Sequence, residues 1–159
     1  MNEGGRTAYD LSNGETPSYA LTQFTWDEFE KFWPGIEDML DRVPHTWKHW
    51  TKDYIRAAVE QSVMQVWGVG PPPKAVLIFF TQVGIYPADR ILHVMWGAGN
   101  FQREMLPVLE AALVNYAQLC ECDSIEVRGR RGWDKHFKSI GMKQECVTWS
   151  YPVPKARMN

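Results

Sequence analysis

Residues 113–145 read LVNYAQLCECDSIEVRGRRGWDKHFKSIGMKQE, and this stretch decides the fold that the sequence predicts. Its apolar spacing indicates the end of a helix, then a strand over 124–129 and a short helix over 132–140. Gly141 is expected to end that helix, because glycine readily adopts the left-handed conformation that closes many helices. Helix, strand and helix in this order are typical of helices packed on a sheet.

The segment upstream completes a crossover connection. RILHVMW, residues 90–96, carries the apolar and β-branched side chains that strands prefer. A helical stripe follows, and Pro107 is tolerated because it lies near the start of that helix. The residues of the stripe are Met105, Leu106, Leu109, Leu113, Tyr116, Ala117 and Cys120. A strand, a helix and another strand make a crossover, so the strands at 90–96 and 124–129 should be parallel.

The first part of the domain is predicted to hold a strand and a helical region. SYALTQF, residues 18–24, alternates in the manner of a strand. Thr25 and Glu28 have the spacing of a capping box, which predicts a helix beginning near Trp26. Pro34 lacks an amide hydrogen, so together with Gly35 it is expected to divide this helical region into two short pieces.

Three further strands and one helix are expected in the rest of the domain. Thr51 can cap a helix whose apolar face carries Tyr54, Ile55, Ala58 and Val59. Strands are expected over 62–69 and 75–86, the latter buried on both faces, and together with 90–96 they form an antiparallel meander. KQECVTWSYPV, residues 143–153, is expected to be a closing strand.

The predicted fold class is therefore α/β (α+β), with a mixed central sheet of about six strands and helices on both faces. Residues 1–17 are polar and aperiodic and are expected to be an N-terminal arm, residues 18–153 the domain, and residues 154–159 a C-terminal tail.

Composition excludes several classes of function. The formal net charge of the 159 residues is −2, so no long-range field draws the whole protein to nucleic acid or to an anionic membrane. No apolar run reaches the ~20 residues that span a bilayer. The three cysteines lack paired zinc-site spacing and are expected to be free thiols. His45, His49 and Asp53 have a spacing that suits a metal, but Thr51 as a helix cap argues against it, and no metal site is predicted.

The order of elements over residues 18–153, and residues 113–145 above all, resembles the GNAT superfamily of acetyltransferases. More narrowly, QVWGV (65–69), ILHVMWGAGN (91–100) and SIGM (139–142) are similar to a family of small bacteriophage proteins labelled acetyltransferase-like. The resemblance implies the GNAT fold and, if the protein is an enzyme, acetyl-CoA as its cofactor. It also implies a protein found in the virion or in the host cytoplasm.

The resemblance further implies a glycine-rich turn at the start of the central helix, where bare amides hold the diphosphate of coenzyme A. Counting back from Tyr116 places Phe101, Glu104 and Leu106 at the family's basic residue and two glycines. Bulky or anionic side chains therefore stand where phosphate would bind.

A displaced loop is the remaining way to form such a cradle. Gly97 and Gly99 could supply amides from the GAGN sequence, with Asn100 and Arg103 beside them. These four residues are the candidates for cofactor binding if the protein binds acetyl-CoA.

His93 is the catalytic candidate, since the resemblance places it where such enzymes carry a general base, and its unperturbed pKa is near neutral. The structural alternative, which the residues favour, is a histidine paired within the sheet or exposed on its outer face. Phe137 stands where the family often has a tyrosine that protonates the leaving thiolate, and phenylalanine has no proton to give.

A basic stretch next to this helix is the candidate interaction surface. Its members are Arg128, Arg130, Arg131, Trp133 and Lys135. Such a stretch could contact phosphates, but acidic residues dilute it and the domain is not basic, so nucleic acid is not the favoured partner. The preferred interpretation is a surface helix whose Trp133, Phe137 and Ile140 pack inward.

The leading hypothesis is a bacteriophage GNAT-fold protein that is non-catalytic and acts as a binding module in the virion or in its assembly. Its partners would be other phage structural proteins, a host protein or a second copy of the chain. The alternative is an N-acetyltransferase that moves an acetyl group from acetyl-CoA to an amine of a host or phage target, with His93 as base. Fold by itself does not choose between them.

Overall fold

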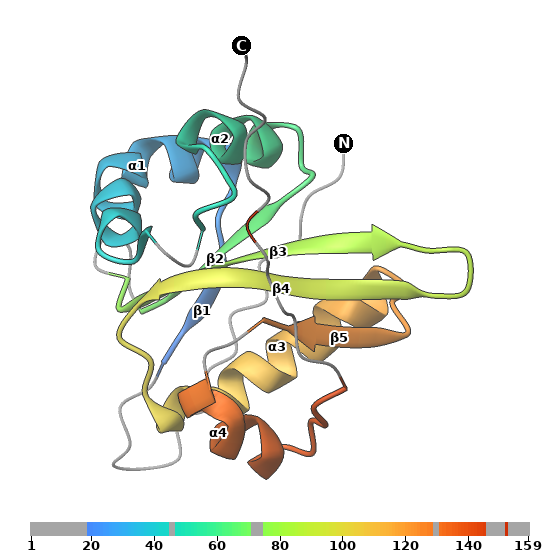
Figure 1. Cartoon of the computed structure of the whole chain (residues 1–159). Helices are drawn as coiled ribbons and strands as arrows, with labels where there is room; N and C mark the ends of the chain where they lie inside the picture. The colour runs from blue at the N-terminus through green and yellow to red at the C-terminus, as the bar shows by residue number, and fades with distance from the viewer. Residues whose placement is uncertain (1–18, 45–46, 71–74, 129–130, 146–151, 153–159) are drawn as a thin grey trace.

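The structure is a computed structural model that describes residues 19–44, 47–70, 75–128, 131–145 and 152. These residues form one five-stranded sheet with helices on both faces (Figure 1). The strands are β1 (Leu21–Gln23), β2 (Gln65–Val69), β3 (Leu77–Ile85), β4 (Arg90–Gly99) and β5 (Ser124–Val127). The helices are α1 (Trp26–Asp41), α2 (Lys52–Glu60), α3 (Leu106–Leu119) and α4 (Asp134–Ser139), with 3-10 turns η2 (Arg103–Met105) and η3 (Arg131–Trp133).

The sheet has the mixed topology that the sequence predicts. The strands lie in the order β1-β2-β3-β4-β5, with antiparallel pairs up to β4 and β5 parallel to β4. The crossover through α3 is confirmed. The described residues form five strands rather than about six: of the expected closing strand, 143–145 are irregular, and 146–151 and 153 lie outside the described residues, as do the arm at 1–17 and the tail at 154–159.

Helix α1 is continuous, so the predicted division at Pro34 is wrong. The capping box is present, since Thr25 Oγ1 accepts from the Glu28 amide and the Glu28 carboxylate accepts from the Thr25 amide. Pro34 and Gly35 are exposed, whereas the opposite side of the helix carries the buried residues Phe29, Trp33, Ile36 and Leu40. Burial of one such side chain contributes about 1.5–3 kcal/mol. Burial of these four against the sheet therefore outweighs the loss of one backbone hydrogen bond at Pro34.

Helix α2 begins after Thr51, as predicted, because the Thr51 hydroxyl accepts from the amide of Tyr54 at 3.2 Å. Ile55, Ala58 and Val59 are buried against the sheet. Tyr54 is 49% exposed, so it does not belong to the buried face that was expected to include it.

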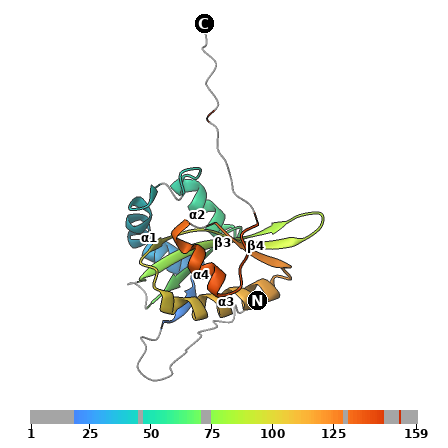
Figure 2. The ribbon, with the colours of Figure 1, turned by 60° about the horizontal axis from the view of Figure 1, so that its bottom comes forward.

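The two faces of the sheet have separate cores. Ile78 and Phe80 of β3 pack with α1 and α2, while the alternate residues Leu77 and Phe79 pack with α3. Strand β3 is therefore buried on both faces over its first half, as its sequence predicts. Figure 2 shows α3 running along the face of the sheet opposite to α1 and α2.

The predicted apolar stripe of α3 divides between two environments. Of its predicted members, Met105, Leu106 and Ala117 are buried. Val108 and Ala112, which the prediction did not include, are buried in the core on the sheet as well. Leu109 and Leu113 are half-buried and line a cavity beside β4. The short helix α4 closes at Gly141, whose φ of +85° is the left-handed conformation expected of a glycine stop.

Candidate functional site

Strand β4 is irregular at its centre. Phe80 of β3 pairs with Trp96 while Thr81 pairs with Val94, so Met95 is an extra residue, a β-bulge. Strand β5 pairs with β4 only up to Val94, opposite Val127. Among the described residues, the part of β4 after the bulge therefore pairs on one side only, and its other edge is open.

A cavity of about 1280 Å³ lies along this open edge and is called the β4 cavity below. Its floor is β4 from Val94 to Gly99. One wall is the segment before α2, with Lys48, His49 and Trp50, and the other wall is formed by α3 and α4. A cavity of this size at the open edge of a strand is the candidate binding site of the molecule.

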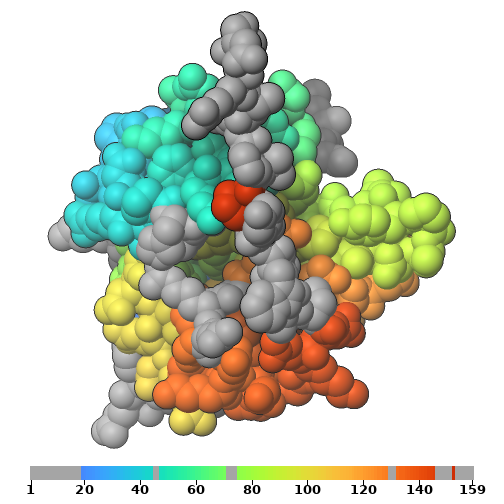
Figure 3. Space-filling view, viewed as in Figure 1, coloured from blue at the N-terminus to red at the C-terminus, as the bar shows by residue number. Residues whose placement is uncertain are grey.

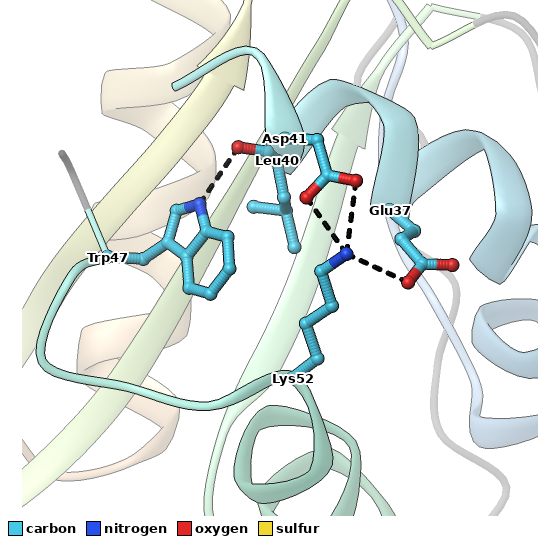
Figure 4. A network of polar contacts seen from close by, with 5 residues as sticks. All are labelled: Glu37, Leu40, Asp41, Trp47 and Lys52. Carbon is cyan, nitrogen blue, oxygen red and sulfur yellow. Dashed lines mark hydrogen bonds and ion pairs between the residues drawn. The ribbon is translucent and has the colours of Figure 1, made fainter. Parts of the chain in front are cut away.

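The segment before α2 is held to α1 by polar contacts, which Figure 4 shows. The indole N–H of Trp47 donates to the carbonyl oxygen of Leu40 at 2.9 Å, which satisfies an end group of α1. Lys52 Nζ lies 2.9 Å from Glu37 Oε1 and 2.8 Å from Asp41 Oδ1, and these hydrogen bonds raise the pKa of Lys52. The contacts fix the wall that carries Lys48 and His49.

Gly97 and Gly99 do not lie in a displaced loop, so that expectation is wrong. Both are within β4, where Gly97 pairs with Phe79 and Gly99 with Leu77. Gly99 has a φ of +117°, and a Cβ there would come within 2.3 Å of the Val76 carbonyl oxygen, so glycine is required by the strand end. Sequence spacing could not find this, because it depends on the pairing of residues 96–99 with β3.

The loop before α3 uses several of its amides internally. The amide of Asn100 donates to the carbonyl of Val76 at 2.8 Å, and the amide of Met105 donates to that of Gln102 at 3.0 Å. The amide of Leu106 donates to the carbonyl of Arg103 within η2. Arg103 is exposed and is not a wall residue of the β4 cavity.

Aromatic rings join this loop to α4. The ring of Phe101 lies 4.7 Å from that of Trp133 at an angle of 26°, and 5.5 Å from the ring of His136. Phe137 packs on Trp133 at 5.6 Å and also lines the β4 cavity, so a phenyl ring stands where the family often has its acid. The stack connects the loop before α3 with the segment at the start of α4.

Among the titratable side chains of the described residues that line the β4 cavity, basic ones predominate. Five are basic, namely Lys48, His49, Arg128, Lys135 and His136, while Glu110 is acidic. They come from the segment before α2, the end of β5 and α4. The remaining wall is largely apolar, so the β4 cavity suits a ligand or chain segment with an apolar body and negative charge.

The candidate interaction stretch contributes to this cavity in part. Arg128, Trp133 and Lys135 line it, and Trp133, Phe137 and Ile140 are half-buried, as the inward-packing interpretation predicts. Arg130 lies outside the described residues, and the side chain of Arg131 is not described.

His93 does not line the β4 cavity and is paired on both ring nitrogens. Its Nδ1 lies 3.4 Å from Glu126 Oε2 on β5, and its Nε2 lies 3.1 Å from the hydroxyl of Tyr86. The sequence reasoning missed Tyr86 and Glu126, because their approach to His93 depends on the register of three strands. Glu126 is directly opposite His93 in the parallel pair.

Other candidate sites are not present in the described part of the chain. His45 lies outside it, and α2 begins only at Lys52, so His49 and Asp53 do not share one helix. No group of three metal-binding side chains gathers among the described residues. Cys120 and Cys122 are free thiols, and burial raises the pKa of Cys122. Within the same residues, no helix has the length and apolarity to cross a membrane.

No protein-family model matches the sequence, and no curated protein matches it. Solved structures do match. An aminoglycoside acetyltransferase from an uncultured soil metagenomic sample has a TM-score of 0.64 at 13% identity, covering 86% of this chain and 97% of that one. Glucosamine-6-phosphate N-acetyltransferase from Arabidopsis thaliana has a TM-score of 0.63 at 10% identity, covering 86% and 99%.

A predicted acetyltransferase from Clostridium acetobutylicum, whose structure holds acetyl-CoA, has a TM-score of 0.62 at 9% identity, covering 85% of this chain and 96% of that one. At these identities the likeness concerns the fold. The five-stranded mixed sheet, the crossover through α3 and the match along nearly the whole of each neighbour agree with the resemblance in the sequence. The chain has the GNAT acetyltransferase fold.

Proposed function

We propose that this GNAT-fold protein is a binding module that does not transfer acetyl groups from acetyl-CoA. The observation that carries the proposal is the stack of Phe101 on Trp133, which bridges the loop before α3 and α4. The fold's cofactor needs bare backbone amides in this loop, and we infer that the two rings, which line the β4 cavity, obstruct the approach of its diphosphate to them.

The loop itself supports the proposal. Amides of Asn100, Met105 and Leu106 are engaged within the chain, which leaves fewer donors for phosphate oxygens. Glu104 adds a carboxylate in η2, directly before α3. A diphosphate at this place would be repelled by that carboxylate instead of being attracted by the positive end of a helix. A phosphate-binding loop requires free backbone amides and no carboxylate beside them.

The β4 cavity is then the site at which the module binds. Its apolar walls and five basic side chains favour an anionic segment of a partner. The proposal that this partner is a component of a bacteriophage particle rests on the sequence resemblance alone. Mass spectrometry of purified particles tests it: the chain should be found at a fixed copy number, and its absence from particles would end the virion version.

The second candidate is an N-acetyltransferase, and one observation favours it. The β4 cavity lies where β4 parts from β5, and its basic side chains could meet phosphates through side chains rather than through amides. In this version acetyl-CoA binds along β4 with Arg128 and Lys135 near its phosphates.

Isothermal calorimetry with acetyl-CoA separates the two candidates. The binding module predicts no heat of binding up to millimolar cofactor, which corresponds to less than about 4 kcal/mol of binding free energy. A dissociation constant in the micromolar range would support the enzyme and overturn the binding module. A GNAT enzyme of known acetyl-CoA affinity, titrated in the same cell, is the control.

A further inference from the structure

We propose that Tyr86 is an activated nucleophile, an acyl-accepting hydroxyl served by His93 as base and by Glu126 as the group that orients the base. The three residues lie on one face of the sheet at the β3–β4 hairpin and on β5, and none of them lines the β4 cavity. The proposal is therefore independent of whether acetyl-CoA binds.

We infer the direction of proton transfer from the two polar neighbours of the His93 ring. A carboxylate only accepts hydrogen bonds, so the Glu126 oxygen at 3.4 Å favours the tautomer of His93 that carries its proton on Nδ1. Nε2 then has a free lone pair, and the Tyr86 hydroxyl at 3.1 Å donates to it. Hydroxyl, imidazole and carboxylate in this order are the arrangement that activates an oxygen nucleophile.

Gly84 makes the contact between Tyr86 and His93 possible. Gly84 lies in β3, and Tyr86 is two residues further on, directly after the end of the strand at Ile85. A Cβ at Gly84 would come within 2.7 Å of both His93 Nε2 and the Tyr86 ring. A glycine at the one place where a side chain would separate the two rings is an independent sign that the contact is specific.

The phenol is accessible. Tyr86 is 49% exposed and its neighbour Ile85 is 73% exposed, whereas the His93 side chain is only 13% exposed. Figure 3 shows the β3–β4 hairpin, in yellow-green, standing out from the rest of this face. An acyl donor in solution can therefore reach Tyr86 while the base behind it stays shielded.

The reaction conserves atoms and charge. The Tyr86 oxygen attacks the carbonyl carbon of an activated ester or thioester, and a new ester bond forms as the bond to the leaving group breaks. The phenol proton passes to His93 Nε2, and the imidazolium, stabilised by the Glu126 carboxylate, returns it to the leaving group or to water.

The test is acetylation of the whole chain by p-nitrophenyl acetate, followed by peptide mass spectrometry over time. Tyr54 is the internal control, because it has the same 49% exposure and packs on Trp50 instead of a histidine. We expect Tyr86 to be acetylated at least about tenfold faster than Tyr54, which is below the usual contribution of a general base. Equal rates for the two tyrosines would overturn the proposal.

Variants test whether the fast acetylation of Tyr86 depends on His93 and Glu126 themselves or only on the general surroundings of Tyr86. His93→Gln should bring the Tyr86 rate down to that of Tyr54, and Glu126→Gln should lower it severalfold, while Glu60→Gln on α2 should leave it unchanged. An unchanged Tyr86 rate in Glu126→Gln overturns the proposal. If circular dichroism shows that His93→Gln disturbs folding, Glu126→Gln decides alone, since the Glu126 side chain is 48% exposed and its loss leaves no cavity.

Discussion

The ring of Phe101, in the loop before α3, stacks on the ring of Trp133 at the end of η3, with centroids 4.7 Å apart. The two residues are distant in sequence, and both line the β4 cavity. An aromatic pair of this kind contributes about 0.5–1.5 kcal/mol beyond the area that it buries. The stack therefore holds the start of α4 against the loop before α3.

Replacing Trp133 with Ala should lower the free energy of unfolding by about 1–3 kcal/mol, because a half-buried indole and its ring contacts are lost. Urea denaturation followed by far-ultraviolet circular dichroism measures the change. Lys138→Ala, an exposed position on α4, is the control and should stay within about 0.5 kcal/mol of the parent. Equal effects of the two variants would show that the stack does not stabilise α4.

Phe101→Gly combined with Glu104→Gly should create affinity for acetyl-CoA. The first change removes the ring from the space between the loop and α4, and the second removes the charge that repels phosphate. Calorimetry should then detect binding that the parent lacks. Phe101→Leu with Glu104 retained is the matched control, because it leaves both bulk and charge. Continued absence of binding in the double glycine variant would mean that something else closes the site.

Much of the fold could be predicted from local sequence. The Thr25–Glu28 capping box, the Thr51 cap and the glycine stop at Gly141 are each local patterns with a single structural meaning, and all are present. The continuity of α1 through Pro34 could not be predicted, because it depends on packing of Trp33 and its neighbours against the sheet. At such a position, the burial of neighbouring side chains in the folded protein outweighs the low helix propensity of proline.

The candidate site was less predictable, because it depends on strand register. Gly97 and Gly99 pair with Phe79 and Leu77 of β3, so they lie in β4 and not in the loop in which the sequence suggested them. Register also brings Tyr86 and Glu126 to His93, and no spacing along the chain signals that approach. His93 was identified from the sequence, while its two partners required the structure.

Trp67 and Trp96 form a matched pair for testing the cost of an unpaired donor. Both are 6% exposed, but the Trp67 indole donates to the Thr81 hydroxyl at 2.9 Å, whereas the buried Trp96 indole N–H has no acceptor among the residues that the structure describes. Trp67→Phe should therefore destabilise the protein by about 1–3 kcal/mol more than Trp96→Phe. Denaturation of both variants measures the difference, and the reverse order would contradict the assignment of the two donors.

Cys122 should react slowly with alkylating reagents near neutral pH, because little of its thiol is ionised. Burial, followed by the neighbouring Cys120, raises the pKa of Cys122, so the neutral thiol is favoured in the folded chain. Protonated Cys122 therefore contributes to stability at pH values below the pKa that its thiol has in the unfolded chain. This contribution is lost as the pH rises through the higher pKa of the thiol in the folded chain. Iodoacetamide labelling of Cys122 between pH 7 and 10 should show its inflection at higher pH in native protein than in urea. Coincident inflections would contradict the shift.

The most direct test of the account is a crystal structure grown with millimolar acetyl-CoA. The account predicts Phe101 and Trp133 still stacked and no diphosphate at the loop before α3. Diphosphate oxygens bound by the amides between residues 99 and 106, with the two rings parted, would contradict it and make the protein a cofactor-binding member of the fold.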